Sequence, residues 1–245
     1  MQKNLLFLLF TLLQVSIFAQ DNYHNYLNNW LASDYNLPQG EYVFYDNEAA
    51  INEAAINYGG SFFSETAIGQ EFAQKVRAVI PNAGSNAWDA GWKVSNKETI
   101  DAGDKMLAVF SIRSVNGEGN INFFVENNTT FTKEVILTFS IAEEWRQYII
   151  PFESMADYPL NALGWGFHLA NESQTIEIGG FTAFNFKNNV SLNDLPSQIN
   201  NQFYGGYEAD APWRAEAADR IEQHRKADLT VSVVDTDGNP VENAS

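Results

Sequence analysis

The sequence contains no cysteine and has few basic residues. The absence of cysteine from 245 residues excludes a disulfide framework, thiolate metal sites and cysteine nucleophiles. Only 14 lysines and arginines stand against 31 aspartates and glutamates, so the formal net charge is −17. Because proteins bind nucleic acid largely by neutralising phosphates with basic side chains, this balance argues against a nucleic-acid partner. A neutral polymer or a cation is compatible with it.

The motifs of the common hydrolases are also missing. The three histidines, His24, His168 and His224, share no metal-binding spacing, and neither His-Glu-x-x-His nor Gly-x-Ser-x-Gly occurs. Glycoside cleavage needs only two carboxylates at a defined separation, but so many acidic residues guarantee coincidental pairs. We therefore assign no catalytic residue within this chain.

Hydrophobic runs long enough to cross a membrane are absent as well. The longest apolar stretch, Leu5 to Phe18, follows Lys3 and ends at the small residue Ala19. It is shorter than the roughly 20 residues that a membrane-spanning helix needs. We therefore predict that residues 1–19 are a secretory signal peptide and that the product is secreted. No cysteine follows that could carry a lipid anchor.

What the sequence does contain is a hydrophobic fraction of 45% and a series of short β-rich runs separated by glycine, asparagine, aspartate and proline. We predict strands over residues 41–46, 72–80, 87–95, 106–115, 121–127, 134–141, 145–152, 165–171 and 174–186. Residues 49–57 are compatible with a helix or a loop. Many short strands at regular spacing predict an all-β, antiparallel β-sandwich of the jelly-roll, galactose-binding-like type.

Helical patterns occur at the two ends of this β-rich region. Apolar residues at helical spacing predict a short helix within residues 22–33. We expect the sandwich to occupy residues 20–190, a polar linker residues 191–208, and a helix with the first strands of a further region residues 209–245. The last β-hairpin lacks most of its return strand, which suggests the front of a longer protein.

A sandwich can bind sugar chains on the outer face of a sheet, where aromatic rings stack on pyranose rings and polar groups bind hydroxyls. Because side chains alternate along a strand, Phe124 and Glu126 are expected to lie opposite Phe123 and Val125. A carboxylate beside an aromatic ring on a solvated sheet would suit a sugar.

The same alternation selects two further candidates. His168 should point outward if Phe167 points inward, as should Arg77 if Val76 points inward. The alternative for His168 is a structural histidine with its hydrogen bonds satisfied.

For two aromatic candidates, the position in the sequence does not decide between a ligand-binding and a structural role. Trp88 is expected within the strand 87–95, where it shares a face with Trp92 and is as compatible with the core as with a ligand platform. Phe131, in the loop between Asn127 and Lys133, could form a wall of the binding groove or plug its end. The complete candidate set is Trp88, Phe124, Glu126, His168, Arg77 and Phe131.

A set of different short motifs is distributed along residues 70–245. They include Asn86-Ala87-Trp88-Asp89, Phe124-Val125-Glu126, Trp145-Arg146-Gln147-Tyr148, Phe167-His168-Leu169, Gln174-Thr175-Ile176-Glu177-Ile178-Gly179-Gly180, Ala211-Pro212-Trp213-Arg214 and Asp237-Gly238-Asn239-Pro240-Val241. Together they resemble carbohydrate-binding modules of the family 4/9/22 type. The later motifs are similar to modules found ahead of family 10 glycoside hydrolases, which are xylanases.

The resemblance implies a jelly-roll module that binds β-1,4-linked plant polysaccharide, most simply xylan, joined to the start of a catalytic barrel. The two catalytic glutamates of that barrel have no counterpart here, so any xylanase activity would belong to a longer protein. Modules of this type often hold a structural Ca²⁺. No motif places its ligands, although Asp46, Asn47 and Glu48 supply hard oxygen donors. We expect a monomer that requires no other cofactor. The rival hypothesis is a cell-surface module whose exposed aromatic residues bind protein.

Overall fold

Two antiparallel sheets packed face to face form most of the first of two compact units into which the chain divides, residues 1–202 and 203–245. The computed structural model describes residues 22–44, 51, 56–199, 216–217, 220–222 and 233–241. The predicted signal peptide and most of the predicted C-terminal helix lie outside the described residues. No helix among the described residues is both long and apolar enough to span a membrane.

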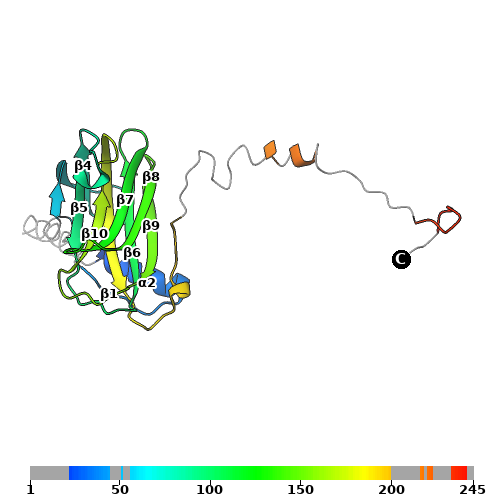
Figure 1. Ribbon diagram of the computed structural model, residues 1–245, viewed down its shortest axis with the longest axis horizontal. Coiled ribbons are helices and arrows are strands. Elements are labelled where there is room, and N and C mark those ends of the chain that lie inside the picture. The colour runs from blue at the N-terminus through cyan, green and yellow to red at the C-terminus, as the bar shows by residue number, and fades with distance from the viewer. Residues whose placement is uncertain are drawn as a thin grey trace, which may run out of the picture. The chain divides into compact units, whose positions relative to one another are not determined.

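The two sheets differ in size and are made of strands from both halves of the unit (Figure 1). The six-stranded sheet has the order β3 (Ser61–Thr66), β4 (Gln74–Ile80), β11 (Gln174–Asn185), β6 (Lys105–Ser114) and β9 (Arg146–Glu153), with β1 (Glu41–Tyr42) also paired to β11. The five-stranded sheet has the order β2 (Ile56–Tyr58), β5 (Gly91–Ser95), β10 (Leu163–His168), β7 (Gly119–Asn127) and β8 (Lys133–Ile141). All of these pairs are antiparallel, which confirms the predicted jelly-roll sandwich.

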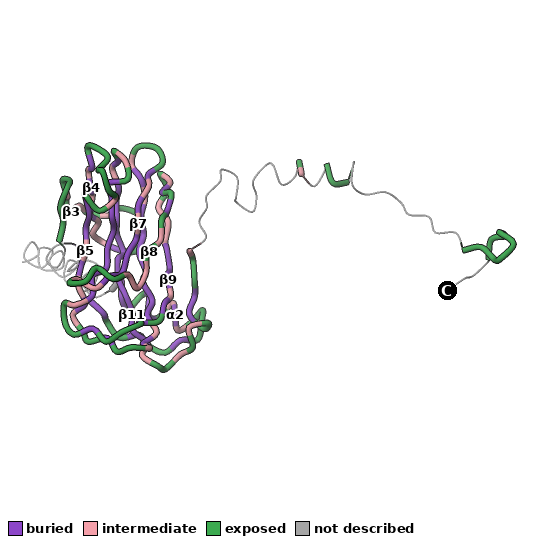
Figure 2. The backbone as a smooth tube through the Cα atoms, viewed as in Figure 1, coloured by how far each residue is buried: buried purple, intermediate pink, exposed green. Residues whose placement is uncertain are grey.

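The core between the sheets is built from the inward-facing side chains of alternating strand positions. Aromatic rings dominate its centre, where Phe110 packs on Phe123, Phe167 and Phe181 with ring centroids 4.9–6.1 Å apart. Figure 2 shows buried residues running along the strands, while exposed residues gather in the connecting loops. Burial of these apolar side chains removes them from water and is the main force that holds the two sheets together.

The helix α2 (Asn22–Tyr35) covers the outer face of the six-stranded sheet. Its residues Tyr23, Leu27 and Leu31 are buried, as the helical spacing predicted, whereas Tyr26 is exposed. They form a second apolar cluster with residues of the sheet and its neighbouring loops, namely Leu37, Phe72, Leu107, Val109, Ile149, Phe184, Phe186 and Leu195. The outer face of the six-stranded sheet is therefore covered by a helix of the same chain.

Several elements differ from the sequence-based expectation. Residues 87–89 form a short 3₁₀ helix, η2 (Ala87–Asp89), at whose start the backbone N–H of Asn86 donates a hydrogen bond of 2.9 Å to the Asp89 carboxylate. The strands β2 and β3 were not predicted, since both lie at sheet edges and are largely exposed, without the alternation of a half-buried strand. Part of the segment expected as a linker packs on the sandwich, where Gln198 pairs with Ile149 of β9.

Only fragments of the second unit are described. Residues 216–217 and 220–222 are helical, within the helix expected there. Asp235 closes the predicted turn, accepting hydrogen bonds from the backbone N–H groups of Asp237 and Asn239, both at 2.9 Å. Val234 then pairs with Pro240 across the turn.

The buried histidine of α2 makes the stability of the fold depend on pH. The His24 ring stacks on Tyr42 with centroids 3.3 Å apart, and its Nδ1 lies 3.3 Å from the Thr182 hydroxyl. Burial lowers its pKa from 6.5 to about 4. The unfolded chain therefore binds the proton more readily, so the free energy of unfolding falls as the pH drops from about 6.5 to 4.

We expect His24→Gln to flatten this pH dependence, because an amide can occupy the same polar contacts without titrating. A single histidine contributes at most about 1.4 kcal/mol per pH unit to the slope. Urea denaturation of both proteins between pH 4 and 7 measures the difference. Curves that run parallel across this range would contradict the assignment.

Candidate functional site

A pocket of about 530 Å³ opens on the outer face of the five-stranded sheet. We call it the aromatic pocket, and its lining residues are Tyr58, Trp88, Lys93, Glu126, Phe131, Lys133 and His168. It brings together four predicted site residues, Trp88, Glu126, Phe131 and His168, which come from well-separated parts of the sequence. Its size is in the range of small-molecule and sugar sites.

Strand parity places the polar lining residues on one face. Trp92, Val125 and Phe167 lie in the core between the sheets, so their neighbours in sequence point outward. On β10, β5 and β7 these outward neighbours include Lys93, Glu126 and His168. Glu126 and His168 therefore point to the outer face of the sheet, as the alternation of side chains along the strands predicted.

Trp88 reaches the pocket from η2 and is not part of a strand. Its ring is 58% exposed, so it is available to a ligand, while Trp92 is buried in the core. Backbone hydrogen bonds from Leu169 to Ala90 and from Ala170 to Ala87, at 2.8 and 3.0 Å, tie η2 to the end of β10. Trp88 and Trp92, which share a face in the predicted strand, thus have different environments in the structure.

Phe131 stands at the tip of the loop between β7 and β8. Asn127 organises this loop, since its side-chain oxygen accepts hydrogen bonds from the backbone N–H groups of Thr129 and Thr130. Phe131 has a φ of 59° and is 62% exposed. A left-handed backbone costs a residue with a side chain free energy, and this strained residue presents a ring to the pocket.

A glycine in β10 leaves no side chain between Lys93 of β5 and Phe124 of β7. Gly166 pairs with Lys93 of β5 on one side and Phe124 of β7 on the other. A Cβ atom at this position would lie 2.2 Å from the carbonyl oxygen of Trp92. Any side chain here would therefore collide with the neighbouring strand.

The carboxylate of Glu126 lies between two ammonium groups. It is 4% exposed and forms an ion pair with Lys133, while Nζ of Lys93 lies 4.0 Å from its other oxygen. Lys93 also donates a hydrogen bond of 2.9 Å to the side-chain oxygen of Asn128. Glu126 was expected as a solvated carboxylate, whereas the structure shows it as a buried acceptor with cationic partners.

His168 is buried next to Trp88, and one of its ring nitrogens has no hydrogen-bond partner among the described residues. Its ring stacks on Phe124 with centroids 4.3 Å apart, and Trp88 approaches it edge-on at 6.3 Å. No hydrogen bond is made by its Nδ1 within the described structure. Burial, and then the charges of Lys133 and Lys93, outweigh the opposing effect of Glu126 and lower the pKa of His168 to about 4. The ring is neutral at pH 7, and its free nitrogen can donate or accept a hydrogen bond, depending on the tautomer.

Two of the predicted site residues do not line the pocket. Phe124 has the predicted orientation, but its ring is fully buried under His168 and Lys133, so it supports these groups and offers no free stacking face. Arg77 lies on β4 of the other sheet, 3.7 Å from the buried Glu177. This corrects the prediction that Arg77 belongs to the same site, because parity gives the face of a strand but not the sheet.

Three lining residues were missed in the sequence. Lys93 was on an outward position of a predicted strand, so strand parity could have selected it. Lys133 begins β8 opposite Glu126, which only the strand register reveals. Tyr58 lies on the unpredicted strand β2, and burial and the charge of Glu126 raise its pKa.

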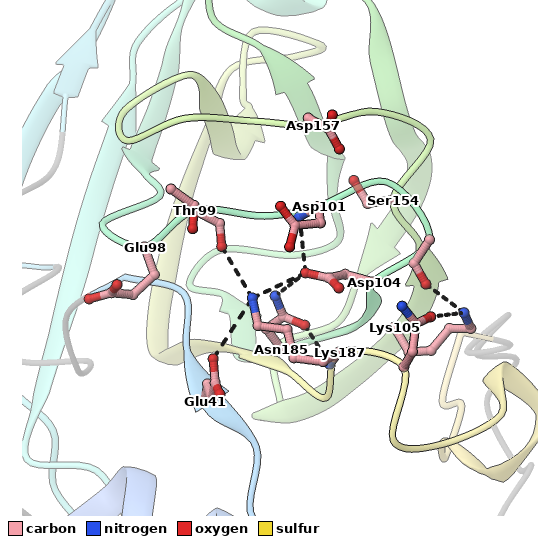
Figure 3. Close-up of polar contacts among 12 residues, drawn as sticks. Glu41, Glu98, Thr99, Asp101, Asp104, Lys105, Ser154, Asp157, Asn185 and Lys187 are labelled. Carbon is pink, nitrogen blue, oxygen red and sulfur yellow. Dashed lines mark hydrogen bonds and ion pairs between the residues drawn. The ribbon is translucent and has the colours of Figure 1, made fainter.

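A structural Ca²⁺ stays an expectation from the resemblance. Among the described residues, no group of three or more acidic or histidine side chains is placed to hold a metal ion. In the loop region drawn in Figure 3, the buried Asp104 accepts hydrogen bonds from Asn185 at 2.6 Å and from Lys187 at 3.3 Å. Lys187 also lies 3.4 Å from the carbonyl oxygen of Thr99. An ammonium group thus already compensates the buried carboxylate, while Asp46, Asn47 and Glu48 lie outside the described residues.

Among known proteins, several solved structures are similar to the chain at low sequence identity. No protein-family model matches the sequence, and no curated protein matches it. A solved structure described as a CBM4 module is 16% identical, with a TM-score of 0.45, over 54% of this chain and 95% of that one. A CBM22 xylan-binding domain from Paenibacillus barcinonensis Xyn10C is 12% identical, with a TM-score of 0.46, over 60% and 96%.

A further similar structure comes from Clostridium thermocellum. It contains the CBM22 and family 10 catalytic modules of a xylanase in complex with xylohexaose. It is 10% identical to this chain, with a TM-score of 0.46, and the match covers 60% of this chain and 29% of that one. Carbohydrate-binding modules are thus among the solved structures to which the chain is similar.

We expect Phe131→Gly to be more stable than Phe131→Ala by about 0.5–1 kcal/mol, because glycine adopts the positive φ without steric cost. Urea denaturation of the two variants measures the difference. The same exchange at Met155, an exposed residue outside the positive-φ positions, should have the opposite sign. A glycine variant at 131 that is no more stable than the alanine variant would contradict strain at this residue.

Proposed function

We propose that the aromatic pocket binds a β-1,4-linked plant polysaccharide, with xylan as the expected polymer. The observation that carries this proposal is the arrangement of the exposed rings of Tyr58, Trp88 and Phe131 around the polar groups of Glu126 and His168. Pyranose rings have apolar faces that stack on aromatic side chains, while their hydroxyl groups need hydrogen-bond partners. The pocket supplies both kinds of contact.

The placement of the pocket also supports a polymeric ligand. It opens on a sheet whose outer face, in the described part of the chain, is not covered by α2. Trp88 and Phe131 both come from segments that connect strands, and both are more than half exposed. A chain of sugar rings could lie across such a surface, whereas a closed cavity would admit only a small molecule.

The likeness of the later motifs to modules ahead of family 10 xylanases extends this proposal. We propose that the chain is secreted and that it serves as the non-catalytic, polysaccharide-targeting part of a xylanase. Because the sequence gives no ground for assigning a catalytic residue, we expect the isolated chain to release no reducing ends from xylan.

We expect Trp88→Ala and Phe131→Ala each to weaken xylan binding by about tenfold, the scale of one lost aromatic contact. Both side chains are exposed, so the melting temperature should change little. Affinity electrophoresis of the full chain in gels with and without soluble xylan measures the binding. Phe63→Ala, which removes a 51% exposed ring on the other sheet, is the matched control and should migrate like the wild type.

Unchanged migration of the wild-type chain in xylan and in mixed-linkage glucan would refute polysaccharide binding. If a glycan array is also blank and the exposed rings instead retain a protein in pull-down experiments, the rival protein-binding function replaces it.

A further inference from the structure

The charge of the aromatic pocket is opposite to the charge of the whole chain. The chain carries a formal charge of −17. Among the residues that line the pocket, however, the two lysines Lys93 and Lys133 face one glutamate, Glu126. His168 is neutral at pH 7, because its pKa is lowered to about 4. The pocket therefore has one positive charge more than its own carboxylate compensates.

The two ammonium groups are held in place before any ligand arrives. The side chain of Lys93 is only 16% exposed, and its head group is fixed by the hydrogen bond to Asn128. Lys133 is 30% exposed, and its ammonium lies 5.3 Å from the centre of the Phe124 ring. Partly desolvated charges at fixed positions bind an ion of opposite sign more strongly than mobile charges on the surface do.

Gly166 places no side chain between Lys93 and Phe124, and the Glu126 carboxylate lies between the two lysines. Lys93 and Phe124 are neighbours of Gly166 on opposite sides, and the ring of Phe124 lies below the ammonium of Lys133. The Glu126 carboxylate is the single acidic group among the residues lining the pocket, and both of its oxygens already have cationic partners. A second carboxylate, supplied by a ligand, could share these ammonium groups.

We infer that the aromatic pocket recognises a carboxylate-bearing sugar, a hexuronate unit of the polysaccharide, through the ammonium groups of Lys93 and Lys133. This inference rests on the proposed function, since the rings of Trp88 and Phe131 would hold the neutral part of the polymer. The unpartnered Nδ1 of the buried His168 supplies a further hydrogen bond to the same ligand.

Binding of glucuronoxylan and of its carboxyl-reduced form tests the inference, because the two polymers share a backbone and differ in the charge of the side groups. Isothermal titration calorimetry on the full chain measures both affinities. We expect the native polymer to bind about tenfold more tightly than the reduced one, the effect of one charge-assisted contact.

Two substitutions in the pocket should have opposite effects on the native polymer. Lys133→Gln should reduce its affinity about tenfold and bring it close to that of the reduced polymer. Glu126→Gln should instead increase it several-fold, because it removes the acidic competitor. If the ion pair only maintained the shape of the pocket, both substitutions would weaken binding of both polymers.

Controls of equal charge are available on the other sheet. Arg77→Gln and Glu65→Gln change the net charge as the two pocket variants do, but they lie on β4 and β3. They should leave both affinities unchanged. Melting temperatures recorded with and without ligand show that each variant is folded, and Lys133→Gln alone tests the inference if Glu126→Gln does not fold.

The outcomes separate the inference from the function on which it rests. If both polymers bind equally and Lys133→Gln affects neither, uronate recognition is wrong while polysaccharide binding stands. If neither polymer binds, both proposals fall. If Lys133→Gln weakens only the native polymer, the inference is supported.

Discussion

The packing of α2 on the six-stranded sheet determines which face of the sandwich is left for a ligand. A two-sheet sandwich has two outer faces, and each must be either polar or covered. Here Tyr23, Leu27 and Leu31 bury the apolar outer residues of the six-stranded sheet, such as Val109 and Phe184. The five-stranded sheet has the aromatic pocket on its outer face. The two outer faces therefore differ because the amphipathic helix α2 packs on only one of them.

The pocket itself depends on rigid supports beneath groups that a ligand can reach. Phe124 is fully buried, yet it holds His168 by stacking and Lys133 by a cation–π contact. Glu126 fixes the same lysine from the side by an ion pair. These contacts restrict the rotamers of the polar groups, so less conformational entropy is lost when a ligand binds. Phe124 therefore contributes to the site although a sugar could not stack on it.

Much of this arrangement could be predicted from local sequence patterns. The rest depends on which strands pair, and these pairs join residues that are distant in the sequence. The spacing of Tyr23, Leu27 and Leu31 predicted the helix, and alternation predicted the outward side chains of Glu126 and His168. Alternation cannot tell which of two sheets a strand joins, so Arg77 was grouped with them although β4 lies in the other sheet. The partners of a strand depend on contacts distant in sequence, which no local periodicity encodes.

The pairing of Lys133 with Glu126 shows why the charge of the site escaped a reading of the sequence. The two residues are seven positions apart and are joined by a loop that turns at Phe131, so their contact needs the register of β7 on β8. Before that register is known, Glu126 is one of 31 acidic residues and looks like a free acceptor for sugar hydroxyls. Once it is known, the same carboxylate has two cationic neighbours, and the two lysines outnumber the one glutamate that lines the pocket. In a chain this acidic, the overall charge argues against a nucleic-acid partner, whereas the few lysines brought together by the fold make the pocket locally cationic.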